Sequence, residues 1–285
     1  MRIAFVVRDE LMPVRNGYHS TGINLLRQLA KMAEVRCVYL GANAGQQTET
    51  ASWCASLGIQ YHAVGIPELP HIDGSLGMFG SLWRAASRTL RQRVVQSLTN
   101  IGLGQNGERV VVFTSGWDAI SDVVAGMTRG AVCFPADSIT LFEKSRLLSG
   151  ARAMLRPARV AFASVREKAM LRSGYARIVY VAARDAQVAR SLVPSISGRV
   201  VTTPIGINPE DFDGAQPMTE RVAENGELLL FSGTLVYLPN RDAATRLASQ
   251  ILPRIKRAAV RLRLVGSGGE VLASFASARL EIAGW

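Results

Sequence analysis

A turn near the C-terminus carries residue types that bind phosphate groups. Gly233 and Thr234 follow the apolar run 228–232, and Asn240 and Arg241 then open a predicted helix. A glycine lets the backbone approach a ligand closely, and the N–H groups at a helix N-terminus attract anions. The Arg241 guanidinium adds a cation at the same place. We therefore predict that Arg241, together with the N-terminus of this helix, contacts a bound phosphate.

A second glycine turn follows the next apolar run along the chain. It is the stretch LVGSGGE, residues 264–270, in which Gly266 comes directly after the apolar residues. Parallel strands bring their carboxyl ends to one edge of a sheet, so the two turns are expected side by side. Either turn alone is a weak signal, whereas the pair fits a nucleotide diphosphate.

The loop 13–22 lies between the first predicted strand and the first predicted helix. Gly17 allows close backbone approach to a ligand, and either Ser20 or Thr21 can cap the helix. The pattern is not G-x-G-x-x-G and no acid follows the next strand, which disfavours a dinucleotide site. A plain turn without a ligand explains these residues equally well. For His19 in this loop, a surface position is a better explanation than a catalytic base.

Asp137 and Ser138 come just past the end of another predicted strand. Asp137 can accept a proton or hydrogen-bond a hydroxyl group, which suits a catalytic role. The alternative is structural, because an Asp-Ser pair is also a good N-terminal cap for a helix. The three histidines and three cysteines show no zinc-ligand spacing, so no metal is expected.

The basic residues are concentrated in two segments. Segment 76–98 has four arginines and no acid, segment 140–178 has nine basic and two acidic residues, and together they account for the net charge of +11. The first segment predicts a short amphipathic helix on an anionic membrane, or else an ordinary surface helix. Its predicted membrane contacts are Trp83, Arg84, Arg88 and Arg91. With 7% aromatic residues and no helix-turn-helix spacing, no nucleic-acid partner is expected.

Apolar strands alternate with amphipathic helices along the 285 residues. This pattern predicts an α/β fold in which helices cover both faces of parallel sheets. The first alternation covers residues 1–207, the second covers 227–285, and a polar linker, 208–226, joins them. Hydrophobic residues make up 48% of the chain, which is enough for a sizeable core, and no apolar stretch is long enough to cross a membrane.

Several stretches resemble, in order, the retaining GT-B glycosyltransferases of family 4. The stretch TTPIGINPEDF, residues 202–212, is similar to the family's strand–Pro–Asn–Gly–Val–Asp–x–x–Phe crossing. Residues 228–268 resemble the pattern F-x-G-x-x-x-Y-x-P-N-x-D-A, then ILP-x-I, then L-x-I-V-G-x-G. The stretch ADSITLFEKSR, residues 136–146, looks like the Asp-Ser element of the same branch.

The resemblance implies two Rossmann-like, doubly wound parallel-sheet domains that face each other across a cleft. Residues 1–207 would be the acceptor-side domain, and 227–285 would be part of the nucleotide-sugar domain. The residues expected to bind the donor are Gly17, Gly233, Thr234, Asn240, Arg241 and Gly266. The residues expected on the acceptor side are Asn16, His19 and Ser138, with Asp137 as the catalytic residue.

Two departures from the family pattern concern the donor. Many members place Arg and Lys where this chain has Thr234 and Pro239, which leaves Arg241 as the substitute cation. The family also carries two glutamates separated by seven residues, and no two glutamates of this chain have that spacing. The second domain is therefore expected to be only partly present, and the chain to be inactive or impaired as a transferase.

The expected function is transfer of a sugar from a nucleotide sugar to a polysaccharide or lipid-linked acceptor, without metal or cofactor. The expected location is the cytoplasm, peripheral on the inner face of the plasma membrane. A non-catalytic remnant that binds membrane or acceptor is the alternative, and a sugar-nucleotide epimerase of similar fold is a third. The donor sugar, linkage and oligomeric state are not predicted.

Overall fold

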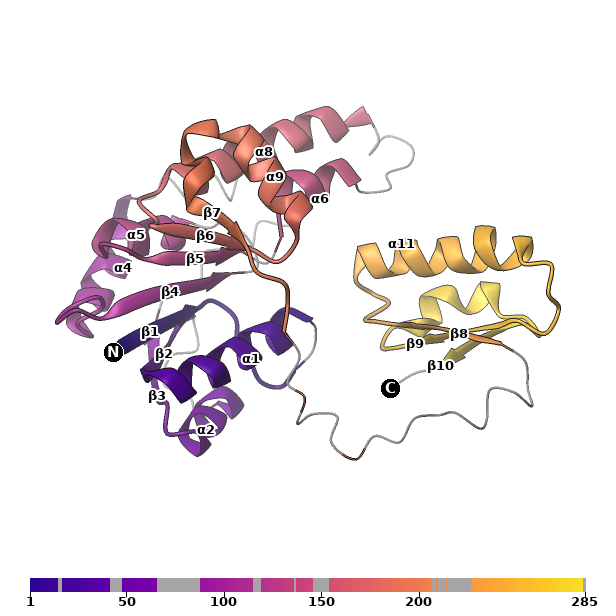
Figure 1. Cartoon of the computed structure of the whole chain (residues 1–285), viewed down its shortest axis with the longest axis horizontal. Helices are drawn as coiled ribbons and strands as arrows, with labels where there is room; N and C mark the ends of the chain where they lie inside the picture. The colour runs from indigo at the N-terminus through magenta and orange to yellow at the C-terminus, as the bar shows by residue number, and fades with distance from the viewer. Residues whose placement is uncertain are drawn as a thin grey trace. The chain divides into compact units, whose positions relative to one another are not determined.

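The apolar runs in the first part of the chain form one parallel sheet in the computed structural model (Figure 1). Its strands are β1 (Arg2–Val7), β2 (Glu34–Gly41), β3 (Gln60–Gly65), β4 (Arg109–Thr114), β5 (Val132–Pro135), β6 (Arg177–Tyr180) and β7 (Val200–Thr202). Their order is β3-β2-β1-β4-β5-β6-β7, and every pair is parallel. This is a doubly wound order whose direction reverses between β1 and β4.

The chain divides into two compact units, Met1–Ile207 and Asn208–Trp285. The structure describes residues 1–14, 17–41, 48–65, 88–114, 119–135, 137–145, 154–206, 209, 214 and 227–283. Almost the whole predicted linker 208–226 therefore lies outside the described residues.

Helices cover both faces of the seven-stranded sheet. One face carries α1 (Gly17–Met32) and α2 (Glu49–Ser56). The other face carries α4 (Arg88–Asn100), α5 (Ala119–Met127), α8 (Arg156–Arg172), α9 (Ala183–Leu192) and the 3-10 turn η2 (Pro194–Arg199). The short helix α6 (Ile139–Ser145) follows β5 and packs against α8.

Each face of this sheet has its own apolar core, because successive side chains of a strand point to opposite faces. In β1, Ala4 and Val6 join the cluster under α4, α5 and α8. Phe5 and Val7 join the cluster under α1 and α2. All four side chains are at most 1% exposed, which explains why β1 reads as a continuous apolar run.

The second unit holds a parallel sheet of three strands, in the order β10-β9-β8. The strands are β8 (Leu228–Ser232), β9 (Arg261–Val265) and β10 (Leu280–Ala283). Helix α11 (Leu238–Arg246) continues as a π turn (Leu247–Ile251) and a 3-10 turn (Leu252–Arg254), and η6 (Gly269–Phe275) is also a 3-10 helix. Both helical segments lie on the same face of the sheet (Figure 1), over one apolar cluster.

The other face of the small sheet is charged in its middle. Arg263 of β9 pairs with Glu281 of β10 at 2.8 Å between nitrogen and oxygen. At the edge, Leu228, Leu229 and Leu230 of β8 are 36%, 38% and 64% exposed. Among the described residues, β8 pairs with β9 alone.

The α/β class with two parallel sheets is as the sequence predicts, but three helices differ from expectation. The first helix begins at Gly17, whereas the pattern predicts a start at Ile23. The helix that the sequence predicts to open at Asn240 and Arg241 begins at Leu238, leaves α-helical geometry at Leu247 and ends at Arg254. Pro253 explains the ending, since proline has no N–H to continue the helix. The predicted helix 270–278 is the 3-10 helix η6.

Candidate functional site

The carboxyl ends of the strands in a doubly wound sheet are where ligands bind, at the point where strand order reverses. In the large unit this point lies after β1 and β4, next to the start of α1. Gly17 is the first residue of α1 and is exposed. No heavy atom lies within 4 Å of the place a Cβ would take there, so Gly17 leaves open space at this edge.

The glycine that packing requires in α1 is Gly22, which the sequence pattern does not single out. A Cβ at Gly22 would lie 2.8 Å from side-chain atoms of both Leu11 and Phe113. No local sequence signal marks this requirement, because Leu11 and Phe113 meet Gly22 only in the folded chain. Gly22 thus lets α1 approach the end of β4 closely.

The other predicted residues of this loop have structural contacts. Thr21 does not cap the helix, because its hydroxyl donates to the Gly17 carbonyl at 2.7 Å from inside α1. His19 is 9% exposed, so the expected surface position is wrong. Its Nδ1 lies 3.3 Å from the Pro13 carbonyl oxygen. Asn16 lies outside the described residues.

Ser138 is buried at the start of α6 and belongs to a polar network. Its hydroxyl donates to Glu167 Oε2 at 2.9 Å and accepts from the Leu141 N–H at 3.1 Å, which is the capping bond that the sequence offers as the structural alternative. Its own N–H donates to Asp185 Oδ1 at 2.8 Å. The Ser138 side chain is therefore fully engaged within the protein.

Glu167 of α8 is the centre of this network and was not predicted from the sequence. It is 1% exposed and accepts from three donors: the Ser138 hydroxyl, the Thr140 N–H and the Tyr180 hydroxyl, each at 2.9 Å. A carboxylate with three donors can stay buried, because each hydrogen bond offsets part of its desolvation cost. As one of only two acids in the basic segment 140–178, Glu167 could have been noticed.

Asp137 stands beside this network with an exposed side chain. Partial desolvation, and then the nearby charge of Asp185, raise the pKa of the Asp137 carboxyl above its usual value. A carboxyl whose pKa is raised holds its proton closer to neutral pH and is better suited to proton transfer. The Ser138 N–H bond to Asp185 fixes the turn that presents it.

In the small unit, the two predicted glycine turns lie together at the carboxyl edge of the sheet. The Leu235 N–H donates to the Ser267 carbonyl at 2.8 Å, which joins the turn after β8 to the turn after β9. Gly268 has a φ of +81°, and a Cβ there would lie 2.4 Å from a methyl carbon of Val236. The close approach of the two turns therefore depends on this glycine, which lies within the predicted turn 264–270, two residues after Gly266.

The remaining residues that are predicted to bind the donor belong mainly to the turn that enters α11. A Cβ on Gly233 would lie 2.7 Å from the Asn240 amide nitrogen, so a side chain there would displace the Asn240 side chain. The Asn240 side chain donates to the Thr234 carbonyl at 3.2 Å and closes the turn. Arg241 is half-buried in the first turn of α11, and its guanidinium has no partner among the described residues. Gly266 directly follows β9, with its N–H bonded to the Ala283 carbonyl.

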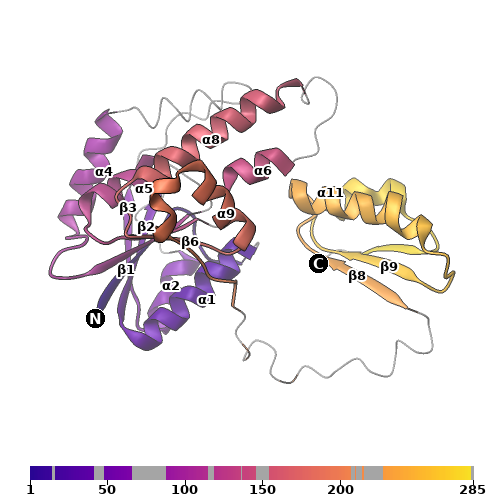
Figure 2. The same ribbon diagram turned by 45° about the horizontal axis from the view of Figure 1, so that its top comes forward.

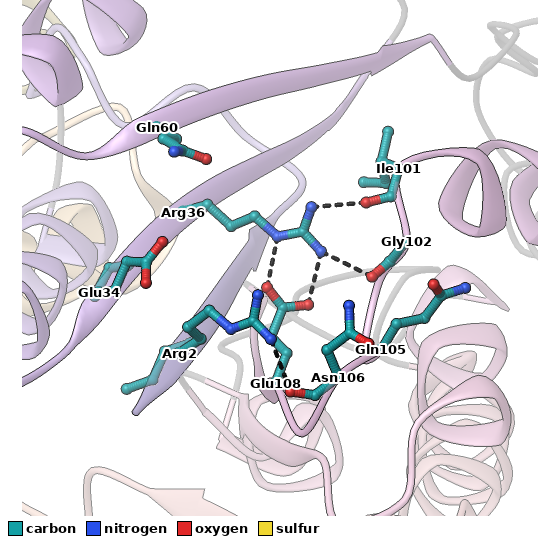
Figure 3. A pocket seen from close by; sticks show the side chains of 11 residues that line it. Arg2, Glu34, Arg36, Gln60, Ile101, Gly102, Gln105, Asn106 and Glu108 are labelled. Atoms are coloured by element: carbon teal, nitrogen blue, oxygen red, sulfur yellow. Dashed lines mark hydrogen bonds and ion pairs between the residues drawn. The ribbon is translucent and has the colours of Figure 1, made fainter.

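A further concavity of about 220 Å³ lies at the opposite, amino-terminal edge of the large sheet (Figure 3). Arg36 crosses it and donates twice to Glu108, at 2.6 and 2.7 Å, and also to the Ile101 and Gly102 carbonyls. Arg2 donates to the Asn106 carbonyl at 2.8 Å. These cations hold the chain after α4 against the sheet, so we assign the concavity a structural role.

Of the predicted membrane contacts, Trp83 and Arg84 lie outside the described residues, and Arg88 is described by its backbone alone, as the first residue of α4. Arg91 is exposed and lies 3.9 Å from Asp122 of α5. Within the described residues, no helix is long and apolar enough to span a bilayer. The same residues contain no cluster of three metal-ligating side chains.

No protein-family model and no curated protein sequence matches the chain. Solved structures do match. Sucrose-phosphate synthase from Thermosynechococcus elongatus superposes with a TM-score of 0.61 at 11% identity, over 100% of this chain and 70% of that one. The trehalose-6-phosphate phosphatase N-terminal domain of Candida albicans gives a TM-score of 0.56 at 12% identity, over 99% and 72%.

A third match is a trehalose-6-phosphate structure from E. coli bound with UDP-2-fluoro glucose, with a TM-score of 0.52 at 12% identity over 100% of this chain and 74% of that one. Identities this low establish the fold and nothing finer. The similarity confirms the expected fold class, Rossmann-like parallel-sheet domains of the GT-B type, which the seven-stranded and three-stranded sheets display.

Proposed function

We propose that the small unit binds a nucleotide sugar and that the chain belongs to a glycosyltransferase of family 4, which transfers the sugar to a polysaccharide or lipid-linked acceptor. The observation that carries the proposal is the pair of glycine turns joined by the Leu235–Ser267 hydrogen bond. They meet at the carboxyl edge of a parallel sheet, where nucleotide ligands of this fold class bind.

The turn entering α11 supplies what a diphosphate needs. Gly233 has no side chain to obstruct the backbone, and the first N–H groups of α11 carry partial positive charge. The half-buried Arg241 guanidinium is a donor without a partner among the described residues, and such a group forms strong charge-assisted bonds to phosphate oxygens. Thr234, Asn240 and Gly266 complete the same surface.

The chemistry we propose needs no metal or cofactor. Bond cleavage in a nucleotide sugar places negative charge on the leaving diphosphate, and the Arg241 cation with the α11 N-terminus would stabilise that charge. Asp137, whose pKa is raised, would accept or share the proton of the acceptor hydroxyl. Gly17 would contribute to binding of the donor. The acceptor would be bound on the side formed by Asn16, His19 and Ser138, and Ser138 would act by holding the turn at the start of α6. Retention of configuration rests on the resemblance to family 4.

A lipid-linked acceptor would place the protein on the inner face of the plasma membrane. Trp83, Arg84, Arg88 and Arg91 remain proposed contacts for that surface. Their support is the sequence of segment 76–98, an apolar stretch followed by four arginines without an acid.

The proposal is tested by titrating the whole chain with UDP-glucose and GDP-mannose in a calorimeter. Arg241→Ala should weaken binding by roughly tenfold or more, since a hydrogen bond to a charged group contributes about 1.5–3 kcal/mol. Arg246→Ala, in the last turn of the same helix, is the matched control and should bind as the unaltered chain does. No binding of either nucleotide, or equal losses in both variants, would contradict the proposal.

Turnover is measured separately by release of UDP or GDP from the bound donor. Binding with turnover supports a transferase. Binding without turnover, in the presence of sugar acceptors, is the result expected both of an impaired transferase and of the non-catalytic alternative, in which the chain holds its ligands but transfers nothing.

A further inference from the structure

The described helices of the two basic segments belong to one layer of the large unit. Segment 76–98 contributes most of α4, and segment 140–178 contributes α6 and α8. Val94 and Leu98 of α4 share a core cluster with Met170 and Leu171 of α8, so both helices cover the same face of the sheet. Figure 2 shows α4, α5 and α8 on that face. Cations of both segments therefore lie in helices that cover the same side of this unit.

One side of helix α8 is exposed to solvent and carries apolar residues. Val165 is 59% exposed, and Met154, just before the helix, is 83% exposed. Ala158, Ala161 and Ala169 are also exposed. Within α8, the spacing of three, four and four residues keeps the exposed apolar residues from Ala158 to Ala169 on one side of the helix, along about 16 Å, and Met154 precedes them.

These apolar residues form the α8 stripe, and its surroundings are cationic. Lys168 and Arg172 border it, and neither has an ion-pair partner among the described residues. The Arg166 guanidinium lies 5.8 Å from the Phe162 ring centre, on the other border.

The acids near α8 have partners of their own. Asp122 accepts from the Ser173 hydroxyl at the end of α8 and lies 3.9 Å from Arg91. Glu143 accepts two hydrogen bonds from Arg159, both at 2.9 Å. Glu167 is buried and faces the Ser138 network, on the opposite side of the helix from the α8 stripe. An approaching anionic surface therefore meets cations and apolar groups together.

We propose that the α8 stripe is a docking surface for an anionic lipid bilayer, with the helix lying parallel to the membrane. Met154 and Val165 would enter the headgroup region. The lipid phosphates would be contacted by Lys168, Arg172 and Arg166. An apolar stripe between cations suits this interface. A nucleic-acid partner would call instead for stacking aromatic residues along the basic face.

This proposal deepens the proposed function and rests on it for the presence of a membrane, because it assigns the attachment to α8. It also differs from the membrane contact predicted at residues 83–91. Arg91 there is paired with Asp122, whereas Lys168 and Arg172 have no such partner within the described part of the chain.

The test is co-sedimentation of the whole chain with vesicles of phosphatidylcholine alone, and with vesicles of equal parts phosphatidylcholine and phosphatidylglycerol. We expect binding to the anionic vesicles that weakens as salt is added. Lys168→Glu with Arg172→Glu should weaken it by about tenfold or more, because each cation near such a surface contributes appreciably. Val165→Asp should also weaken it.

Matched controls lie in the small unit. Arg254→Glu with Lys256→Glu changes the net charge equally at exposed positions, and Val271→Asp alters another exposed valine. Both controls should bind vesicles as the unaltered chain does, and near-ultraviolet circular dichroism should show each variant folded. Absence of binding, equal binding to both vesicle types, or equal losses in controls and α8 variants would overturn the proposal. The proposal would also be overturned if the chain self-associates without vesicles and Val165→Asp abolishes that self-association, because a second copy would then occupy the α8 stripe.

The vesicles contain no sugar and no acceptor. If the chain binds nucleotide but not vesicles, the docking surface is refuted and nucleotide binding by the small unit stands. If the chain binds vesicles but not nucleotide, the docking surface stands and the nucleotide site is refuted.

Discussion

Strands β1 and β8 open the two parallel sheets of this chain with almost equally apolar sequences, RIAFVV and LLLFS. In β1, every residue from Ile3 to Val7 is buried. In β8, the first three leucines are exposed, and Leu230 is 64% exposed. The composition of a strand therefore does not decide its burial. Burial depends on whether helices cover one face or both faces of the sheet.

The difference in layers follows from strand order. Crossovers between parallel strands are right-handed, so strands added in one direction place their helices on one face. The large sheet reverses direction between β1 and β4 and gains helices on both faces. The described small sheet runs only from β8 to β10, and both helical segments lie over one face. The Arg263–Glu281 pair occupies the other.

The largest expected effect compares a core aromatic in each sheet. Phe113 is fully buried and stacks 4.4 Å from the Tyr18 ring, so Phe113→Ala should cost about 3–5 kcal/mol of unfolding free energy. Phe231 of β8 is only partly buried, and Phe231→Ala should cost less than half as much. Denaturant unfolding measures both. Equal costs would show that the two sheets pack their cores alike.

The next effect concerns the polar network of the large unit. Glu167→Ala leaves the Ser138 and Tyr180 hydroxyl groups buried without their acceptor, and we expect a loss of about 3 kcal/mol. Tyr180→Phe removes a single hydrogen bond and should cost about 1 kcal/mol. If the two variants unfold at the same denaturant concentration, the carboxylate does not organise this turn.

Glycines sharpen the comparison at the turns. Gly268→Ala should cost about 1–3 kcal/mol, because φ is +81° and the new Cβ would meet Val236. Gly17→Ala in the large unit should be neutral or stabilise by about 0.5 kcal/mol, since space is open there. Thermal unfolding followed by circular dichroism distinguishes the two. An unaffected Gly268→Ala chain would mean that the paired turns can separate.

These contrasts also mark what the sequence could predict. The strand positions and the two glycine turns follow from apolar runs and glycine spacing, which are local signals. The early start of α1 at Gly17 and the need for Gly22 depend on packing against Leu11 and Phe113, which no local pattern shows. Glu167 and Tyr180 meet Ser138 only after β5, α8 and β6 assemble. The site's glycines were therefore predictable, and its buried carboxylate was not.

A smaller effect depends on pH. Burial and Asp185 raise the pKa of Asp137 in the folded chain, so the folded state holds this proton more tightly than the unfolded state. The contribution of this proton to the free energy of unfolding is fully present below the pKa of the unfolded state and is lost as pH rises through the pKa of the folded state. Asp137→Asn should therefore gain stability relative to the unaltered chain as pH rises from acid to neutral. A constant or shrinking difference in unfolding free energy would contradict this.

The smallest expected effect is at the edge of the small sheet. Leu230→Lys replaces a side chain that is already 64% exposed, so the unfolding free energy should change by less than about 0.5 kcal/mol. Denaturant unfolding is again the measurement. A loss comparable to that of Phe113→Ala would show that β8 is covered in solution.

The central claim is that the paired turns of the small unit bind a nucleoside diphosphate. Its most direct test is to follow backbone amide resonances of the whole chain while UDP-glucose is added. We predict saturable shifts confined largely to the amides of Gly233, Thr234, Arg241, Gly266 and Gly268. Shifts absent from these turns at saturating nucleotide, or found instead around the Arg36 concavity at the opposite edge of the large sheet, would contradict the account.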